Sequence, residues 1–260
     1  MNLLEVINVS VKVSARTLVD QISLTLRAGQ LLSIIGPNGA GKSSLLKCVA
    51  GDIEPTEGKL QLHGFAEGQV QRARQLAVLP QLSLLNFPFR VSEVVALGRV
   101  PHSSGAAHDG EIIAHCLALM DITHLQERRY TTLSGGEKQR VQLARVIAQL
   151  WVTDGKVDYP RLLLLDEPTT ALDMGHQQLL LTALQRLTEH GVAILMVLHD
   201  VNLAARCSDT ILAMKDGHCV AAGPPSQVIT APTMQTLFNT ATQIVRHPSD
   251  ASPMVVSVDG

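Results

Sequence analysis

The sequence feature that most constrains the fold is the stretch LLSIIGPNGAGKSSLLKCVAG at residues 31–51. Residues 31–36 begin it with a short, almost continuously apolar run, of the kind that is buried on both faces of a parallel sheet. Residues 43–51 have helical spacing and end on a glycine. We therefore expect a strand, a tight loop and a helix in direct succession, an arrangement typical of α/β proteins.

The loop in this stretch matches the pattern GxxxxGKS through Gly36, Gly41, Lys42 and Ser43. Glycines allow the backbone to wrap closely enough for its N–H groups to bond phosphate oxygens, and the following helix points its positive end at the anion. The lysine adds charge near the outer phosphates, and the serine hydroxyl suits Mg²⁺. The pattern predicts phosphate binding, because an incidental glycine-rich turn need not lie between a buried strand and a helix.

The remaining periodicity predicts more of the same architecture. Residues 3–13 and 22–26 alternate apolar and polar types and indicate antiparallel strands. Apolar runs at 161–166 and 192–200, with a helical pattern at 177–190 between them, favour parallel strands joined by a helix. We expect an α/β fold, a phosphate-loop NTPase core with a mostly parallel sheet and antiparallel N-terminal strands.

Between the two halves of this core, the pattern is helical, with Ser92 and Asp109 placed as helix N-caps. We interpret this part as an inserted helical lobe, and the short apolar pieces near the C-terminus as a small hairpin. The 260 residues then form a single domain that comprises an α/β core at 1–86 and 151–240, a helical lobe at 87–150 and a C-terminal tail at 241–260.

Composition excludes several classes of protein. A net charge of −2 argues against a broad basic face, so we expect no nucleic-acid partner. The four cysteines form no CxxC pair, which argues against a zinc knuckle or an attached haem. The N-terminal residues lack a basic leader, which argues against a secretion signal, and no apolar run is long enough to span a bilayer. Membrane association would have to come through a partner.

The second candidate element of a phosphate site is LLLLDE at 162–167, where a strand delivers two carboxylates. Ligands of parallel sheets bind at the C-terminal ends of the strands. We expect Asp166 to hold Mg²⁺ and Glu167 to act as the general base that polarises the attacking water. The alternative is an acidic pair that simply faces solvent.

The motif LSGGE at 133–137 separates the families of phosphate-loop enzymes. Ser134 can cap the helix that begins there, Glu137 lies at capping-box spacing, and two glycines allow a phosphate to approach. With this motif, the sequence resembles the ATP-binding cassette ATPases over nearly its whole length. That resemblance implies ATP hydrolysis by a head-to-tail homodimer, in which the serine motif of one copy closes on the nucleotide of the other.

The resemblance also implies roles for single residues. Gln81 resembles the glutamine that senses Mg²⁺ and water, Asp173 the aspartate that acts across the dimer interface, and His199 the switch histidine that contacts the γ-phosphate. The expected catalytic residues are Glu167, His199 and Gln81, and the expected Mg²⁺ ligands are Ser43, Gln81 and Asp166. The expected ATP-binding residues are Gly36, Pro37, Asn38, Gly39, Ala40, Gly41, Lys42, Ser43, Ser44, Ser134, Gly135, Gly136, Glu137, Asp173, Val13 and Arg16.

One position departs from the family pattern. The family stacks adenine on an aromatic residue, whereas this sequence has Val13 at the aligned position. We expect Val13 or the aliphatic stem of Arg16 to cover the base instead.

Two segments bear on the cargo. Residues 86–102 resemble the segment with which ATPases of iron-siderophore, haem and cobalamin importers meet their permease; Phe87, Phe89 and Leu97 are either exposed anchors or ordinary core of the lobe. An extra polar loop at 151–160 is similar to one in haemin-importer ATPases. The resemblance implies an importer ATPase at the cytoplasmic face of the bacterial inner membrane, with an integral-membrane permease dimer and, indirectly, a periplasmic haem-binding protein as partners.

Three alternatives stay open at this point. The cargo could be a ferric siderophore or cobalamin. The protein could be a cassette ATPase of DNA repair or the ribosome, although it has neither a long coiled coil nor a second cassette. It could also be an unrelated phosphate-loop kinase or GTPase in which LSGGE is accidental.

Overall fold

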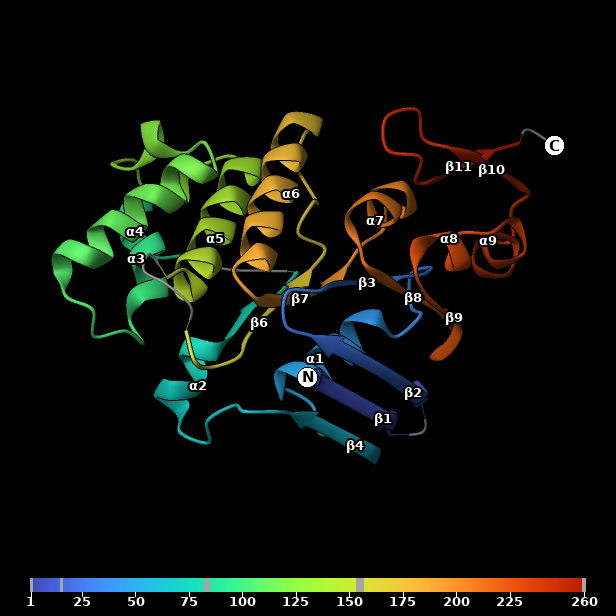
Figure 1. Cartoon of the computed structure of the whole chain (residues 1–260). Coiled ribbons are helices and arrows are strands. Elements are labelled where there is room, and N and C mark those ends of the chain that lie inside the picture. The colour runs from blue at the N-terminus through green and yellow to red at the C-terminus, as the bar shows by residue number, and fades with distance from the viewer. Residues whose placement is uncertain (1, 15, 82–84, 153–156, 259–260) are drawn as a thin grey trace. The chain divides into compact units, whose positions relative to one another are not determined.

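The computed structural model describes residues 2–14, 16–81, 85–152 and 157–258, and its chain divides into two compact units (Figure 1). Residues 1–63 and 195–260 form the first unit, and residues 64–194 the second. The elements of the first unit are β1 Asn2–Val13, β2 Arg16–Arg27, β3 Leu31–Ile35, α1 Lys42–Ala50, β4 Glu57–Leu62, α7 Val201–Cys207, β8 Thr210–Lys215, β9 His218–Gly223, α8 Pro225–Val228, α9 Ala231–Phe238, β10 Thr242–Arg246 and β11 Pro253–Ser257.

The second unit holds most of the helices. Its elements are α2 Gln69–Gln75, β5 Leu76–Leu79, α3 Val91–Ala96, η1 Leu97–Arg99, α4 Ala106–Leu119, η2 Thr123–Leu125, η3 Tyr130–Thr132, α5 Gly135–Leu150, β6 Arg161–Asp166 and α6 Met174–Glu189. Strand β7, Val192–Val197, begins in this unit and ends in the first.

Strand pairing in the first unit follows the predicted pattern. β1 pairs with β2 and with β4, both antiparallel, so that Leu4 lies opposite Leu26 on one side and Leu62 on the other. β3 runs parallel to β8, and β9 adds to β8 in the antiparallel sense. Every residue of β3 is buried, as expected for a strand covered on both faces. With the parallel pair β5 and β6 in the second unit, these pairings confirm a mostly parallel sheet beside antiparallel N-terminal strands.

Helix α1 begins and ends where the sequence indicated. Gly41 is its N-cap and Gly51 its C-cap, both in the left-handed region, with φ of 94° and 89°. The N–H of Gly51 donates to the carbonyls of Lys47 and Cys48, which satisfies part of the last turn. The predicted succession of strand, loop and helix is therefore confirmed.

The helical part of the second unit corrects two predicted caps. Arg90 precedes α3 as its N-cap and Gly105 precedes α4, so neither Ser92 nor Asp109 is a cap. Asp109 lies in the first turn of α4, where its Oδ1 accepts hydrogen bonds from Arg99 Nε and Ser104 Oγ, both at 2.8 Å. The Asp109 carboxylate was expected to cap the backbone of the helix, but it accepts a hydrogen bond from the buried guanidinium of Arg99 instead.

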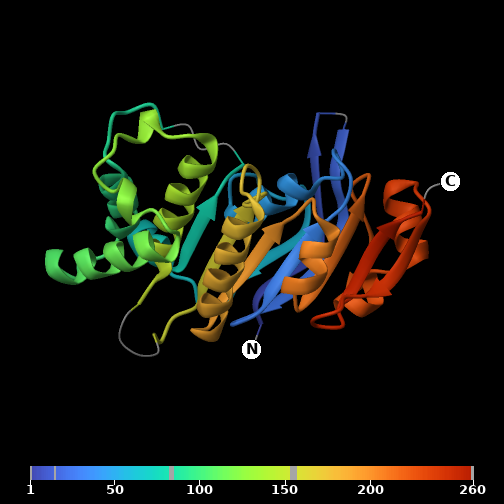
Figure 2. The same cartoon turned by 90° about the horizontal axis from the view of Figure 1, so that it is seen from above.

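The C-terminal strands β10 and β11 pair in register as the expected hairpin. They lie beside α7 in both views of the chain (Figures 1 and 2). The predicted polar loop at 151–160 includes residues 153–156, which fall outside the described residues.

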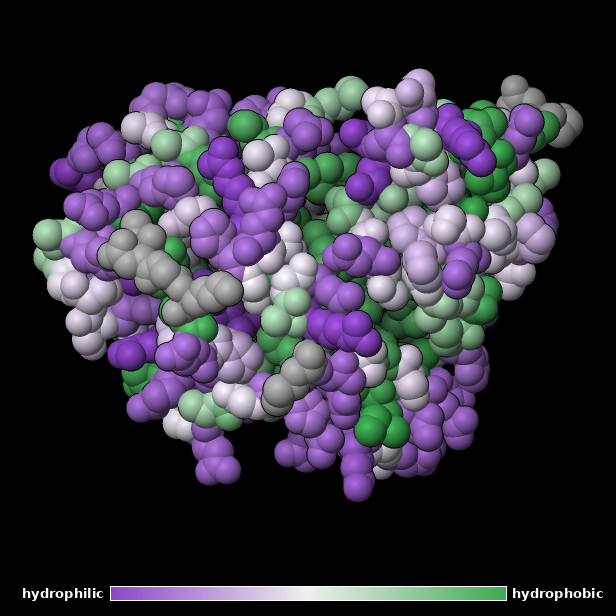
Figure 3. All heavy atoms as spheres, in the orientation of Figure 1, coloured by the Kyte–Doolittle hydropathy of each residue, from purple (hydrophilic) through white to green (hydrophobic). Residues whose placement is uncertain are grey.

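None of the helices in the described ranges is both long and apolar enough to cross a membrane. On the face drawn in Figure 3, hydrophilic side chains predominate and hydrophobic atoms emerge between them in small areas.

Candidate functional site

Lys42, which is expected to bind phosphate, forms hydrogen bonds with the backbone of its own loop. The Nζ atom of Lys42 donates to the carbonyls of Gly36 and Pro37, both at 2.9 Å, and the side chain is only 5% exposed. A buried ammonium is costly unless it is paired, so the loop backbone carries part of its solvation. The loop therefore holds the charged end of Lys42 against its own carbonyl groups.

Two glycines of this loop lie against backbone carbonyls of the first unit. A Cβ atom on Gly36 would come within 2.0 Å of the Met214 carbonyl oxygen, and one on Gly41 within 2.1 Å of the Leu18 carbonyl oxygen. Both glycines also have positive φ, which other residues adopt at a cost. No other residue fits at either position without movement of the backbone.

The carboxylates that follow β6 occupy different environments. Asp166 ends the fully buried strand and is 3% exposed, whereas Glu167 is partly exposed. Glu167 has a φ of 52°, rare for a residue with a side chain, and its carbonyl accepts from Thr170 N at 3.2 Å. Strained backbone of this kind gathers at functional sites. The two carboxylates thus differ in burial and in backbone conformation, although they are adjacent in the chain.

Gln81 and Glu167 are 86 residues apart in the chain and meet in the second unit. The Nε2 atom of Gln81 donates to Glu167 Oε2 at 2.9 Å. The sequence predicted a role for each side chain but gave no sign of this bond. An amide donor on one oxygen of the carboxylate orients the other oxygen, which is what a general base needs.

The LSGGE motif begins helix α5 with a complete capping box. Ser134 Oγ accepts from Glu137 N at 3.3 Å, and Glu137 Oε2 accepts from Ser134 N at 2.8 Å. The Ser134 backbone N–H, the Ser134 hydroxyl and the guanidinium of Arg128 lower the pKa of the Glu137 carboxyl. This confirms the predicted cap and places an ionised carboxylate in the first turn, where the helix dipole favours it.

The start of α5 lies against the segment that follows Glu167. Gln139 Nε2 donates to the carbonyl of Pro168 at 3.1 Å, and a Cβ atom on Gly136 would come within 2.7 Å of the Ala171 carbonyl oxygen. Gly136 is therefore required for close approach, in addition to any role towards phosphate. The LSGGE motif, called the signature motif from here on, and the turn at Glu167 therefore pack against each other within the second unit.

Asp173 closes the same segment as the N-cap of α6. Its Oδ1 accepts from His176 N at 2.9 Å and lies 2.8 Å from His176 Nδ1. The backbone N–H of His176, followed by its side chain, lowers the pKa of Asp173. Asp173 is exposed, and so is the neighbouring Met174, at 87%. The beginning of α6 thus presents an anionic side chain and an apolar one on the surface.

His199 lies in the first unit, between β7 and α7, and is exposed. The residue before it, Leu198, donates its N–H to the carbonyl of Ile34 in β3 at 3.0 Å, which ties this strand end to the strand that leads into the phosphate loop. The first unit therefore carries the phosphate loop and His199. The second carries Gln81, Asp166, Glu167, Ser134, Gly135, Gly136, Glu137 and Asp173.

The two residues expected near adenine lie at the turn between β1 and β2. Val13 faces Arg16 in the strand register, and both are exposed, Val13 at 51%. Ala15 between them is outside the described residues. An exposed valine beside an arginine stem can offer an apolar surface, and their role towards a base stays a prediction.

The three residues predicted either to contact a permease or to lie in the core of the lobe are exposed. Phe87, Phe89 and Leu97 are 66%, 38% and 39% exposed, and the two phenylalanine rings lie 6.0 Å apart between centroids. Val100, which the sequence reasoning did not single out, is 74% exposed in the same segment. Four exposed apolar side chains along one segment fit the predicted contact surface, whose partner stays a prediction.

Arg99, buried beneath this segment, was also missed. Its guanidinium donates to Asp109 Oδ1 at 2.8 Å, to the carbonyls of Ala148 and Trp151 at 2.7 and 3.2 Å, and to Ser104 Oγ at 3.1 Å. Arg99 therefore joins the exposed segment to the C-terminal end of α5, whose first turn carries the signature motif. The one signal in the sequence was weak: a charged residue, Arg99, follows the largely apolar run VVALG.

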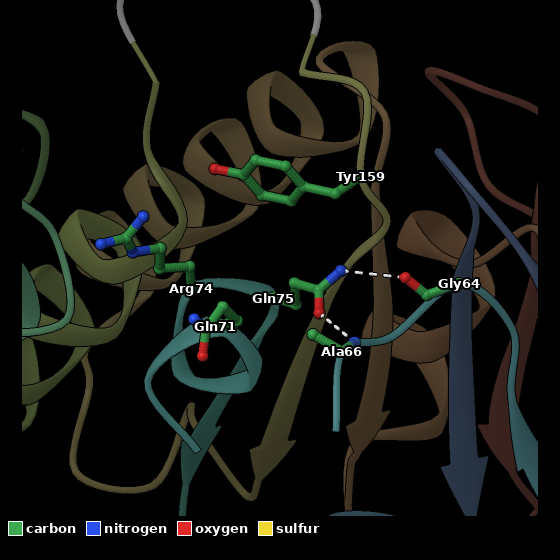
Figure 4. Close-up of a pocket in the computed structure, with 6 residues that line it drawn as sticks. All are labelled: Gly64, Ala66, Gln71, Arg74, Gln75 and Tyr159. Atoms are coloured by element: carbon green, nitrogen blue, oxygen red, sulfur yellow. Dashed lines mark hydrogen bonds between the residues drawn. The ribbon is translucent and has the colours of Figure 1, made fainter. Parts of the chain in front are cut away.

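A separate pocket of about 320 Å³ lies in the second unit, lined by Gly64, Ala66, Gln71, Arg74, Gln75 and Tyr159 (Figure 4). The carboxamide of Gln75 accepts from Ala66 N at 2.7 Å and donates to the Gly64 carbonyl at 3.1 Å. Tyr159 precedes β6, so the pocket is at the opposite end of that strand from Asp166. Because both ends of the Gln75 carboxamide bond to backbone groups, we assign this side chain a structural role.

A metal site can be tested on donor chemistry. Within the described residues, no group of three or more His, Cys, Asp or Glu side chains is placed to hold a metal ion. Mg²⁺ does not require such a group, since it keeps several waters and is bound through one or two carboxylates together with phosphate oxygens. The buried carboxylate of Asp166, at 3% exposure, fits that requirement.

Comparison with known proteins agrees with this arrangement. The family model described as ABC transporter matches residues 19–170. The chain is 45% identical to the hemin import ATP-binding protein HmuV of Gloeobacter violaceus, covering 98% of this chain and 94% of the relative. It is 44% identical to HmuV of Pseudomonas entomophila, covering 98% and 100%.

Among solved structures, an ATP-binding cassette determined as a dimer in a post-hydrolysis state with ADP and Pi aligns with a TM-score of 0.73 and 24% identity, covering 85% of this chain and 98% of that one. At that identity, the alignment supports the fold alone. The family model and the two relatives reach further, because they span the phosphate loop, the β6 carboxylates and the signature motif. The chain belongs to the ABC transporter family.

Proposed function

We propose that this protein is the ATP-hydrolysing subunit of an importer that carries haem into the cell. Its relatives at 44–45% identity over almost the whole chain are named hemin import ATP-binding proteins, and this is the support for the cargo. The support for hydrolysis is one observation, the 2.9 Å hydrogen bond that joins Gln81 to Glu167.

The phosphate loop binds the triphosphate of ATP. Lys42, now bonded to two loop carbonyls, offers its charge to the outer phosphates, and the N-terminal end of α1, which begins at Lys42, offers backbone N–H groups to the anion. Val13 and the Arg16 stem cover the adenine from the β1–β2 turn. Binding thus uses a rigid loop at one end of ATP and exposed surface at the other.

Hydrolysis depends on three side chains. Glu167 removes a proton from the attacking water, Gln81 orients that carboxylate, and His199 contacts the γ-phosphate. Ser43, Gln81 and Asp166 would hold Mg²⁺, which neutralises charge on the phosphate oxygens when it is bound. The chemistry is an in-line attack of water on the γ-phosphorus, with ADP as the leaving group.

Two copies of the chain share each site in this proposal. Ser134 and its glycines close on the nucleotide of the partner copy through the N-terminus of α5, and Asp173 acts across the same interface. The exposed segment with Phe87, Phe89 and Leu97 receives the integral-membrane permease dimer, which holds the protein at the cytoplasmic face of the inner membrane. A periplasmic haem-binding protein acts on the other side of that permease.

We also propose that residues 1–260 act as one ATP-binding cassette domain. Its parts are the α/β core at 1–86 and 151–240, the helical lobe at 87–150 and the tail at 241–260.

The enzymatic part of the proposal is tested with Glu167→Gln. The amide keeps the volume of the side chain but cannot take up a proton, so ATP binds and is not hydrolysed. We expect a stable dimer in Mg–ATP by size-exclusion chromatography, with phosphate release reduced by at least about 100-fold. Glu54→Gln, at an exposed glutamate outside the helices, is the matched control and should behave as the unmodified chain. A Glu167→Gln protein that stays monomeric in ATP would contradict the shared site.

The cargo is tested with the permease and binding protein reconstituted in liposomes. Haem-loaded binding protein should stimulate ATP hydrolysis and move haem into the lumen. Stimulation by a binding protein loaded only with a ferric siderophore or cobalamin would replace haem by that cargo while leaving the ATPase intact. A protein that hydrolyses ATP but neither associates with the permease nor responds to it would favour a cassette ATPase outside transport.

A further inference from the structure

The C-terminal hairpin β10–β11 lies along α7, the helix that begins just after His199 (Figures 1 and 2). Asp200 is the N-cap of α7, and its Oδ1 accepts from Leu203 N at 3.0 Å. Only Asp200 separates His199 from Val201, the first helical residue. The position of the His199 backbone therefore depends on where α7 begins.

Asn202 attaches the first turn of α7 to the hairpin with two hydrogen bonds. Its Nδ2 donates to the carbonyl of Val255 at 3.1 Å, and its Oδ1 accepts from Val255 N at 2.7 Å. A carboxamide that donates and accepts in this way imitates the pairing of one strand residue with another. Of the short side chains, aspartate lacks the donor and serine lacks the reach, so the pair is specific to asparagine.

One turn later on the same helix, Arg206 makes a second attachment. Its Nε lies 3.2 Å from Asp250 Oδ2 in the turn between β10 and β11. Asp250 Oδ1 also accepts from Ser252 N at 3.0 Å and Ser252 Oγ at 2.6 Å, and lies 3.4 Å from His247 Nδ1. These bonds, that of the Ser252 hydroxyl first, lower the pKa of Asp250 to about 2, so the carboxylate is ionised at neutral pH.

The far end of α7 is anchored independently. Ser208 Oγ donates to Ser33 Oγ of β3 at 2.7 Å, and Ser33 is fully buried. Because α7 has only seven residues, an anchor at its last turn leaves the first turn to be fixed by Asp200 and by the hairpin. Without the hairpin contacts, the start of the helix could tilt, and His199 would move with it.

We propose that the C-terminal hairpin is a brace for His199, and that Asn202 is a positioning residue for ATP hydrolysis. The proposal rests on the function proposed above for His199. Asn202 touches neither nucleotide nor water in this account; it acts by holding the first turn of α7 to β11. The C-terminal hairpin thereby affects ATP hydrolysis without contacting the reacting groups.

The test is steady-state ATP hydrolysis by the full chain carrying Asn202→Ala. We expect kcat to fall on the order of tenfold, because small misplacements of a catalytic group are costly, while KM for ATP changes less than about twofold. Asn202→Gln keeps both the donor and the acceptor on a longer stem and should recover part of kcat. The matched control is Gln243→Ala, an exposed position on β10 of the same hairpin, which should leave kcat unchanged.

Single-turnover hydrolysis in a His199→Ala background distinguishes failure of the brace from failure of the proposed role of His199. If Asn202 acts through His199, adding Asn202→Ala to His199→Ala causes no further loss. A further loss of the full size overturns the brace. If His199→Ala alone keeps its rate, the proposed role of His199 fails. If His199→Ala hydrolyses ATP more slowly and folded Asn202→Ala keeps its kcat, only the brace fails.

Should Asn202→Ala not fold, Asp250→Asn takes its place, because it weakens the second attachment and leaves Asn202 intact. It should lower kcat in the same direction by a smaller factor, again with an unchanged KM. A folded Asp250→Asn protein with the kcat of the unmodified chain overturns the proposal.

Discussion

At the scale of single residues, the contact between Gln81 and Glu167 has the clearest chemical consequence. The amide of Gln81 donates to Glu167 Oε2 at 2.9 Å, and the backbone of Glu167 is held at a φ of 52°. A neutral donor at this distance orients the carboxylate and adds no competing charge. The residue type at position 81 therefore sets how the proposed base is oriented.

We predict that Gln81→Glu lowers kcat for ATP hydrolysis more than Gln81→Ala does. A second carboxylate beside Glu167 repels it and cannot donate the hydrogen bond that orients it, whereas alanine only removes that hydrogen bond. Gln81→Ala is therefore the control, since it adds no charge. Equal kcat values for the two variants in steady-state hydrolysis would contradict the contact.

At the scale of elements, Arg99 connects the exposed segment of the second unit to helix α5. Its side chain is 6% exposed, and among the described residues its guanidinium donates to four partners, of which Asp109 is the only charged one. Removing one member of a buried ion pair leaves the other without compensation. The element that meets the permease in our proposal and the helix of the signature motif thus depend on the same side chain.

We predict that Arg99→Met lowers the free energy of unfolding by about 3 kcal/mol or more. Arg99→Lys should recover only part of it, because an ammonium cannot match the planar fork. The matched control is Lys12→Met, which breaks the pair between Lys12 and Glu57. The two side chains are 45% and 57% exposed, so this change should leave the free energy of unfolding almost unchanged. Urea titrations followed by circular dichroism measure all three. Equal losses for Arg99→Met and Lys12→Met would contradict the buried network.

The first turn of α5 gives a dependence on pH. In the folded chain, the pKa of Glu137 lies below its ordinary value of 4.5, chiefly because of the Ser134 N–H. The ionised Glu137 side chain therefore stabilises the fold above pH 4.5, and this stabilisation is lost as the pH falls through the pKa of the folded state. We predict that Glu137→Gln, which keeps the hydrogen bond but not the charge, costs about 0.5 kcal/mol at neutral pH.

The difference between Glu137→Gln and the unmodified chain should disappear in acid, as measured by urea unfolding at several pH values. A cost that stays constant across the titration would mean that the charge of Glu137 contributes nothing to the helix.

At the scale of the whole molecule, non-local pairing limits what a sequence can reveal. Strand β3 and helix α1 were predicted because their signals are local, in apolar runs and glycines. The pairing of Leu32 with Thr210 has no local signal, and neither do the hydrogen bonds between Asn202 and Val255, which are 53 residues apart. Asp109 was assigned to a cap because no local pattern shows that Arg99 takes its carboxylate. Patterns identify elements and motifs, whereas partners across the fold require coordinates.

Ligand binding provides a prediction for the whole chain. Mg–ATP at about 100 times its Kd should stabilise the folded state by about 2.7 kcal/mol, which raises Tm by roughly 5 to 10 °C for a chain of this size. Lys42→Ala should lose this shift, whereas Glu167→Gln should keep it because binding survives without hydrolysis. Thermal denaturation with and without nucleotide measures it, and an undiminished shift in Lys42→Ala would show that ATP binds elsewhere.

The close approach at Gly36 and Gly41 has a consequence for genetics. The atoms that exclude a Cβ there are carbonyl oxygens of Met214 and Leu18, and every amino acid carries such an oxygen. No replacement of Met214 or Leu18 can therefore make room for an alanine in the loop. A search for suppressors of Gly41→Ala should therefore return reversion to glycine, whereas a defect in Arg99, whose partners include the side chains of Asp109 and Ser104, leaves second-site suppression open.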